Sequence, residues 1–211
     1  MATSTQNLTK KVLAQIQQCL NALGFSKRAK HQIFVTRITS DVIGMVGLNK
    51  AIGHGDGILE INPVVGVRNQ QIERLVAELD NEPFNELLPA TLAGNIGYLS
   101  PENKYLPFLF NEATAIEMVA DKLCKTVEAY GIPFMKKVAD LATLVDAMTT
   151  TRFRINEVVN YRIPVGLYLL NKREQAKEFL DAQLTDIGNR NDPAAIRYKN
   201  FATELQTRLN K

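Results

Sequence analysis

The chain has 211 residues and a formal net charge of +3 at pH 7, with 45% hydrophobic and 22% charged residues. This length and balance allow a hydrophobic core to form without disulfides or metal ions, and the mild, dispersed charge does not select a nucleic acid or an anionic membrane as partner. No stretch approaches the roughly 18 apolar residues of a membrane span, and residues 1–11 lack the apolar segment of a signal peptide. We therefore expect a soluble, cytoplasmic protein that does not bind membranes.

Residues that commonly carry catalysis are few. The sequence contains two histidines, His31 and His54, and two cysteines, Cys19 and Cys124. Both cysteines lie in helical patterns beside apolar neighbours, which indicates buried free thiols in a reducing cytosol rather than a disulfide. A nucleophile elbow, a phosphate-binding loop and metal-ligand spacing are all missing from the sequence. We expect no cofactor and no metal site, and enzymatic activity is the less favoured interpretation.

The first third of the chain predicts one helix followed by an antiparallel meander. Apolar residues recur at helical spacing from Leu8 to Leu23, and Gly24 supplies a C-terminal cap. The segments that follow are rich in β-branched residues and alternate in places between two faces, as strands do. Three strands are expected, at residues 33–38, 41–48 and 58–67.

One short helix and two further strands are expected after the meander. The segment from Ile72 to Leu79 has a single apolar helical face. Thr91 to Leu99 and Tyr105 to Phe110 are strand candidates, with a turn at residues 101–103 between them. Because Pro107 cannot donate a hydrogen bond to a neighbouring strand, the second candidate is expected to be short or to lie at a sheet edge.

The chain after Asn111, a candidate N-cap, is predicted to be helical throughout. Apolar stripes mark two helices at about 116–130 and 134–148, and Gly131-Ile132-Pro133 is expected to break the chain between them. Three more helices are expected, at about 155–170 with a kink or interruption at Pro164, at 173–187, and after Asp192-Pro193.

This order of elements predicts an α+β architecture. An N-terminal helix and an antiparallel sheet of about four to five strands precede a C-terminal antiparallel helical array. The expected regions are 1–111 for the helix and sheet and 112–211 for the helices, joined in one cooperative domain.

Two basic segments are candidates for partner binding. Arg152-Phe153-Arg154, with Arg162 about two turns later, can grip a carboxylate or stack on a base; the alternative is a helix corner with Phe153 buried. Lys27-Arg28-Ala29-Lys30-His31 can hold phosphate or an acidic protein surface; the alternative is a solvated loop.

The glycine-rich segment from Gly53 to Gly57 is the one place where a histidine and an acid meet among glycines. His54, oriented by Asp56 and with Glu60 on the next strand, can act as a general base or line a ligand site. A simple hairpin loop is the favoured interpretation, because no helix N-terminus follows to bind an anion.

Turn and packing residues spread over most of the chain carry a family resemblance. They are residues 20–27, 33–38 and 58–67, the corner Tyr130-Gly131-Ile132-Pro133-Phe134, and the segment from Leu170 to Leu180. With these features the chain resembles bacterial domain families of unknown function whose members include immunity proteins of polymorphic toxin systems. The resemblance implies a single-domain cytosolic binding protein that blocks a toxin or another effector, and it implies no catalytic residue.

The favoured functional prediction is a non-catalytic protein-binding module. Its expected contacts are an exposed sheet face or edge and the corner at 152–154, with another protein as the partner. A nucleic-acid-associated protein that uses residues 27–31 with Arg152 and Arg154 is the first alternative. An enzyme or small-ligand binder with a site near His54 is the second, and the oligomeric state stays open.

Overall fold

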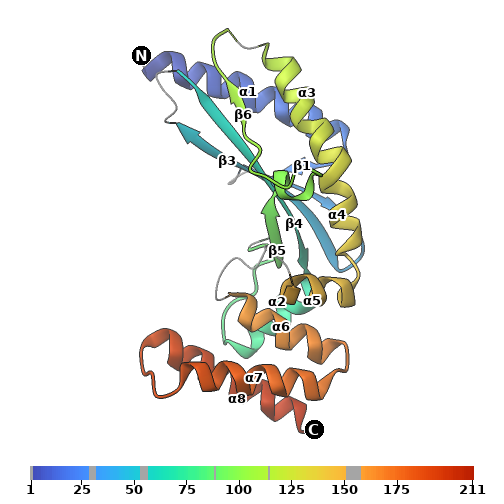
Figure 1. The fold of residues 1–211 in the computed structure, drawn as a ribbon, viewed down its shortest axis with the longest axis vertical. Coiled ribbons are helices and arrows are strands. Elements are labelled where there is room, and N and C mark those ends of the chain that lie inside the picture. Colours follow the sequence, from blue (N-terminus) through green and yellow to red (C-terminus); the bar gives the residue numbers. More distant parts are fainter. Residues whose placement is uncertain (1, 29–31, 53–56, 88, 114, 151–157) are drawn as a thin grey trace. The chain divides into compact units, whose positions relative to one another are not determined.

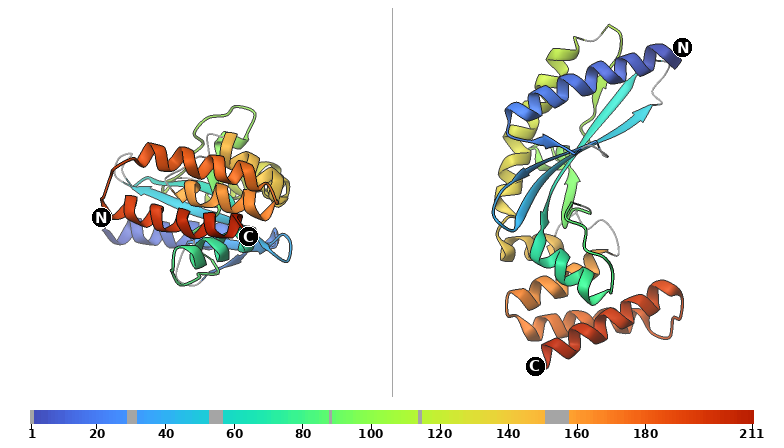
Figure 2. Two further views of the ribbon diagram at one scale, coloured as in Figure 1. Left: turned by 90° about the horizontal axis from the view of Figure 1, so that it is seen from below. Right: turned by 180° about the vertical axis from the view of Figure 1, so that it is seen from behind.

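A computed structural model describes residues 2–28, 32–52, 57–87, 89–113, 115–150 and 158–211 (Figures 1 and 2). Six strands form one sheet in the order β1-β2-β3-β4-β5, with β6 also paired to β4. The predicted α+β architecture, with an N-terminal helix, an antiparallel sheet and a helical C-terminal region, is confirmed. The elements are α1 (Ala2–Ala22), β1 (Ser26–Lys27), β2 (Ile33–Arg37), β3 (Val42–Ile52), β4 (Leu59–Asn69), α2 (Gln70–Leu79), β5 (Leu92–Asn95), the 3-10 helix η1 (Ile96–Leu99), β6 (Phe108–Phe110), α3 (Ile116–Thr126), the π-helical turn η2 (Val127–Gly131), α4 (Ile132–Lys137), α5 (Leu141–Thr150), α6 (Val158–Leu169), α7 (Arg173–Ile187) and α8 (Pro193–Leu209).

The chain forms two compact units whose boundaries differ from the predicted division at 111/112. The first unit contains Met1–Val67 and Ala93–Lys137, and the second contains Arg68–Leu92 and Val138–Lys211. The helices α3 and α4 therefore belong to the sheet unit, while α2 belongs with the C-terminal helices. The reason is burial, because α3 packs along α1 and β6, whereas the apolar face of α2 packs against α6 and α8.

One face of the sheet in the first unit is covered by the run from α3 to α4. Met135 of α4 lies so close over Gly44 that a Cβ atom at this glycine would come within 2.9 Å of the Met135 sulfur. Gly131 of η2 lies in the same way against the side chain of Val65 on β4. The strand residues on this covered face are fully or almost fully buried and include Phe34, Val46, Leu59, Ile61 and Val65.

The segment at Gly131-Ile132-Pro133 continues a helix, and the predicted break there is wrong. The π-helical turn η2 joins α3 directly to α4, whose second residue is Pro133. A π-helical turn accommodates a proline because it changes the local hydrogen-bond pattern of the helix. In the second unit, α6 likewise runs through Pro164 without interruption.

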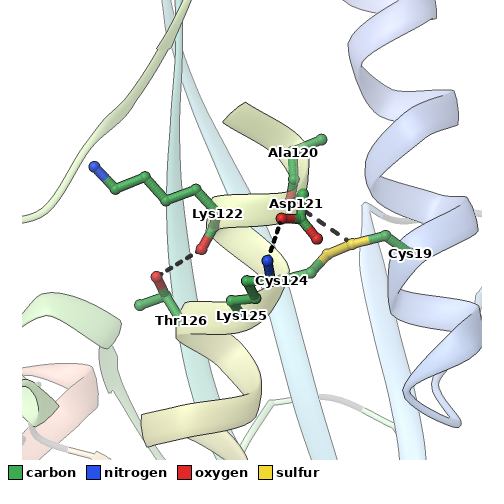
Figure 3. Close-up of a disulfide and its surroundings, with 7 residues drawn as sticks. All are labelled: Cys19, Ala120, Asp121, Lys122, Cys124, Lys125 and Thr126. Atoms are coloured by element: carbon green, nitrogen blue, oxygen red, sulfur yellow. Dashed lines mark hydrogen bonds and ion pairs between the residues drawn. A yellow bond between two sulfur atoms is a disulfide. The ribbon is translucent and has the colours of Figure 1, made fainter. Parts of the chain in front are cut away.

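Cys19 of α1 and Cys124 of α3 form a disulfide, so the prediction of two free thiols is wrong (Figure 3). Their Cα atoms are 6.3 Å apart. Both cysteines occupy the apolar faces along which α1 and α3 pack, and this packing brings them to the same level. The apolar neighbours of each cysteine, which suggested buried free thiols, belong to the packing contact between α1 and α3. This contact brings the two cysteines together.

Among the residues that the structure describes, no helix is both long enough and apolar enough to cross a bilayer.

The N-terminus of α2 is held by Asn69, which leads to a first prediction. The Asn69 side-chain oxygen accepts hydrogen bonds from the backbone N–H groups of Gln71, at 3.1 Å, and Ile72, at 3.0 Å. Asn69→Ala removes this cap, and we expect the free energy of unfolding to fall by about 0.5–2 kcal/mol in urea denaturation. Asn210→Ala, at the exposed end of α8, is the matched control and should have little effect. Equal stability of the two variants would contradict the capping role.

Candidate functional site

The face of the sheet opposite α4 presents apolar side chains to the surface. Antiparallel partners share a face, and Ile33 pairs with Gly47 while Arg37 pairs with Ile43. A Cβ atom at Gly47 would meet only the Val64 carbonyl oxygen, at 3.8 Å, so space is open above this part of the sheet. Ile33, Ile43 and Val64 are half-buried. Between the first two of them on the same face, the paired residues Val35 and Met45 are buried, so the face is exposed only in part.

Three large exposed side chains extend this surface toward β6. Leu109 is 48% exposed and lies on the same face as Glu60, its partner on β4. Tyr105 is 46% exposed, and its hydroxyl donates a hydrogen bond to the Glu60 carboxylate. Tyr98, near Tyr105, is 43% exposed. We call the surface made by Ile33, Ile43, Val64, Tyr105 and Leu109 the open sheet face.

The hydrogen bond to Glu60 fixes the position of Tyr105. The Glu60 side chain is buried, at 3% exposure, whereas Tyr105 is 46% exposed. This hydrogen bond is the main reason why the pKa of Tyr105 is raised, and desolvation and the negative charge of Glu60 add to the effect. The ring is thus anchored at its hydroxyl end while its face remains accessible.

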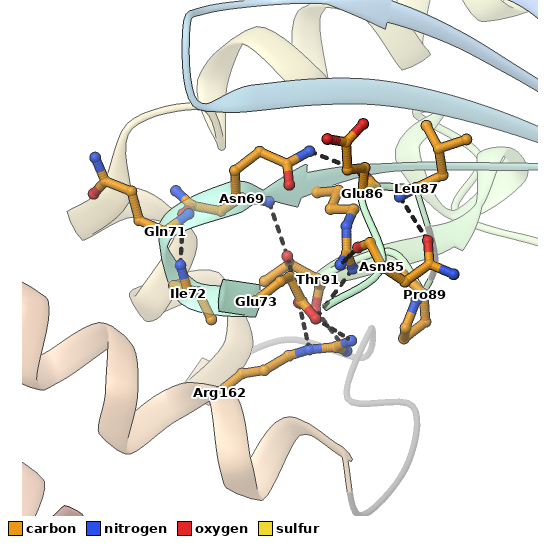
Figure 4. Close-up of polar contacts among 12 residues, drawn as sticks. Asn69, Gln71, Ile72, Glu73, Asn85, Glu86, Leu87, Pro89, Thr91 and Arg162 are labelled. Carbon is orange, nitrogen blue, oxygen red and sulfur yellow. Dashed lines mark hydrogen bonds and ion pairs between the residues drawn. The ribbon is translucent and has the colours of Figure 1, made fainter. Parts of the chain in front are cut away.

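A second candidate site is a buried polar cluster in the second unit, formed by Arg68, Glu73, Thr91 and Arg162. Figure 4 shows Glu73, Thr91 and Arg162 of this cluster. Glu73 forms ion pairs with Arg162 Nε at 2.7 Å and with Arg68 Nη1 at 3.1 Å. Its carboxylate also accepts a hydrogen bond of 2.7 Å from the Thr91 hydroxyl. Desolvation by burial lowers the pKa of Arg68, and the positive charge of Arg162 adds to this effect while Glu73 opposes it. One carboxylate is therefore shared by two buried guanidinium groups.

The cluster is positioned by the junction between β4 and α2. Arg68 ends the apolar part of β4, Asn69 caps α2, and Glu73 lies in the first turn of that helix. The backbone N–H of Asn69 donates to the Thr91 hydroxyl at 2.9 Å, which links the junction to the segment before β5. Arg68 also donates to the backbone carbonyls of Asn85 and Pro89. One hydrogen-bond and ion-pair network thus holds the end of β4, the first turn of α2 and the segment from Asn85 to Thr91.

A cavity of about 570 Å³ opens beside this cluster. Its volume lies within the range typical of small-molecule sites. At the rim, Arg197 is half-exposed and forms ion pairs with Asp80 and Glu82. The remaining lining residues are Val76, Ala77, Pro83, Asn85, Pro89, Tyr161, Pro193 and Ala194.

The structure places Arg162 differently from the sequence-based expectation. Its side chain is buried and paired with Glu73 rather than exposed on a basic corner. The apolar environment of α6 explains this, because a buried guanidinium needs a carboxylate partner within the same core. Its expected neighbours Arg152, Phe153 and Arg154 lie outside the described residues.

The other predicted site residues are described only in part. Lys27 is half-buried in β1 and Arg28 is exposed after it, while Lys30 lies outside the described residues together with His31. His54 and Asp56 lie outside them as well. Glu60, the remaining member of that predicted group, is bound to Tyr105.

The sequence did contain signals for the residues that were missed. Arg68 follows the apolar run Val64-Val65-Gly66-Val67, and a charged residue at the end of a buried strand needs a partner nearby. In Phe108-Leu109-Phe110 the two phenylalanines point to one face, which leaves Leu109 on the other. Neither signal identifies which distant side chain completes the site.

No protein-family model, curated protein or solved structure matches this chain. In the part of the chain that the structure describes, no group of three or more histidine, cysteine or acidic side chains is arranged to hold a metal ion.

Proposed function

We propose that this protein is a non-catalytic protein-binding module whose partner docks on the open sheet face. The observation that supports this most directly is that Tyr105 and Leu109, each more than 40% exposed, both lie against Glu60 on one face of the sheet, with Tyr98 near Tyr105. Contiguous exposed apolar patches mark interaction sites in soluble proteins, whereas single exposed apolar residues do not. Tyrosine is also among the residues enriched at protein interfaces.

The anchoring of Tyr105 supports a role in partner binding, in addition to its exposure. A side chain that is already held by a hydrogen bond loses less conformational freedom when a partner covers it. Glu60 provides this restraint from below the surface, because its carboxylate is buried and accepts the Tyr105 hydroxyl. The role of Glu60 in this proposal is therefore to position an interface residue.

For the partner we propose an effector protein whose activity is blocked when the open sheet face covers it. The resemblance to immunity-containing bacterial families supports this choice. An apolar surface bordered by tyrosines fits a partner that presents apolar side chains, since burial of apolar area is the main favourable term in association. Such a mechanism requires occupation of the effector surface and no chemical step.

Affinity capture from a lysate of the native host, with and without nuclease, identifies the partner, and purified components then give the affinity. We predict that Leu109→Asp weakens partner binding at least tenfold, because it introduces a charge into an apolar interface. Ile196→Asp is the matched control, since Ile196 on α8 is 47% exposed and belongs to the second unit. The melting transition should be unchanged in both variants.

If Leu109→Asp binds the partner as tightly as the unmodified protein does, the partner does not dock on the open sheet face. Capture that disappears after nuclease treatment would instead favour a nucleic-acid-associated protein.

A further inference from the structure

We propose that a second cavity, between α6, α7 and α8, is a binding site for a small, uncharged polyol of the size of one sugar ring. Its volume is about 170 Å³, and its lining residues all belong to the second unit, so the site is independent of the open sheet face in the first. A water molecule occupies about 30 Å³ in the liquid, so the cavity has room for about five or six water-sized groups. The ligand class follows from three features: unused hydrogen-bonding groups, cancelling charges, and an apolar part of the wall.

Three side chains that line the cavity have unused hydrogen-bonding groups. Asn160 comes from α6, and Gln183 and Asp186 come from α7. In the part of the chain that the structure describes, none of these three side chains forms a hydrogen bond or an ion pair with another residue. An amide group both donates and accepts hydrogen bonds, whereas a carboxylate only accepts them. Because a hydroxyl group also donates and accepts, a ligand with several hydroxyl groups matches this mixed set.

The charges around the cavity cancel one another. Asp186 and Arg190 are its charged lining residues. Arg190 Nε pairs with Asp192 at 2.9 Å, and the backbone carbonyl of Arg190 accepts a hydrogen bond from Lys199 Nζ at 2.8 Å. These four side chains carry two positive and two negative charges, so neither a cation nor an anion meets an excess of opposite charge. An uncharged ligand is therefore favoured.

The rest of the wall is apolar and suits the face of a ring. Tyr198 is 5% exposed, and its hydroxyl donates to the Asn160 carbonyl at 3.4 Å. The Tyr161 ring packs against it in a T-shaped arrangement, with the ring centroids 5.0 Å apart. These two rings share the wall with Ile187, Ala194 and Ala195. A sugar ring has C–H groups on its faces and hydroxyl groups around its edge, so it can cover apolar surface while its hydroxyls reach the amides.

Titration of the full-length, isotope-labelled protein with D-glucose, D-galactose and D-mannose in separate experiments, followed by amide NMR shifts, tests the proposal. At least one of these sugars should cause saturable shifts at the lining residues Gln183, Ala194 and Ala195. Cyclohexanol has a ring of the same size with a single hydroxyl group, and benzylammonium carries a positive charge. Both should bind at least tenfold more weakly than that sugar.

Two variants test whether the cavity itself binds the sugar. Gln183→Leu removes one amide group and keeps a side chain of similar size, so the dissociation constant should rise at least tenfold. Ala194→Leu fills part of the cavity from its apolar wall and should weaken binding to a similar extent. Gln175→Leu is the matched control and should bind as the unmodified protein does, because Gln175 is an exposed residue of the same helix, α7, and does not line this cavity.

Three results would overturn the proposal. They are the lack of saturable shifts with all three sugars, binding of cyclohexanol or benzylammonium as tight as that of the best sugar, and unchanged sugar affinity in Gln183→Leu. The melting transition of each variant, compared with that of the unmodified protein, shows that a loss of affinity does not result from unfolding.

Discussion

Replacement of Glu73 by alanine is expected to lower the free energy of unfolding by about 3–5 kcal/mol, which is the typical cost of breaking a buried ion pair. Glu73 pairs with Arg162 and Arg68 and accepts the Thr91 hydroxyl, and all these groups are buried. Its removal leaves two unpaired guanidinium charges inside the second unit. Urea denaturation followed by circular dichroism measures the effect.

Glu78→Ala is the matched control for this prediction. Glu78 lies on the same helix and pairs with Arg208, but its side chain is largely exposed, at 64%. Exposed ion pairs contribute about 0–1 kcal/mol, so this variant should remain close to the unmodified protein. If Glu73→Ala were no more destabilising than Glu78→Ala, the buried cluster would not contribute to stability as described.

Removal of the disulfide between Cys19 and Cys124 is also expected to lower the free energy of unfolding strongly. It joins residues 105 positions apart, and closing a loop of that size restricts the unfolded chain considerably. In the chain-entropy description such a bridge contributes about 2–5 kcal/mol. The double variant Cys19→Ser/Cys124→Ser should therefore have a free energy of unfolding lower by this amount and should unfold at a lower urea concentration. Its helix content before the transition should be that of the unmodified protein.

A thiol assay in denaturant provides a direct check. The purified, unreduced protein should show no reactive thiols, and reduction should release both. Addition of a reductant should shift the unfolding curve of the unmodified protein toward that of the double variant. Two reactive thiols without reductant, or a reductant-insensitive unfolding curve, would show that the bridge is not formed in solution.

Local patterns were sufficient to predict most of the elements. The helix predicted at 173–187 is observed as Arg173–Ile187, and the helix predicted after Asp192-Pro193 begins at Pro193 with Asp192 as its cap. Asp192 accepts the Ala195 backbone N–H at 3.1 Å, as the sequence pattern implied. Such signals act over a few residues, so periodicity and capping residues reveal them.

Strand lengths were less predictable because they depend on distant partners. Residues 91–99 were expected to form one strand, but Asn95 ends the strand and caps the 3-10 helix η1 through a hydrogen bond to the Gly97 N–H. The strand expected from Tyr105 is limited to Phe108–Phe110, in line with the effect expected of Pro107. The Tyr105 side chain lies over Glu60, a residue 45 positions away.

The candidate sites depend on contacts that sequence spacing does not encode. Glu73 and Arg162 are separated by 89 positions, and Cys19 and Cys124 by 105. In both cases each residue could be recognised as unusual in its local pattern, but its partner could not be identified. The fold brings them together, as it brings Leu109 and Tyr105 to one face of the sheet.

Site-specific photo-crosslinking tests the proposed function most directly. A benzophenone amino acid replaces Leu109 on the open sheet face in one protein and Ile196 on α8 in another, two sites with nearly equal exposure of 48% and 47%. With the captured partner present, we predict an efficient crosslink from position 109 and little or none from position 196. A partner that crosslinks equally from both positions, or only from position 196, would contradict docking on the open sheet face.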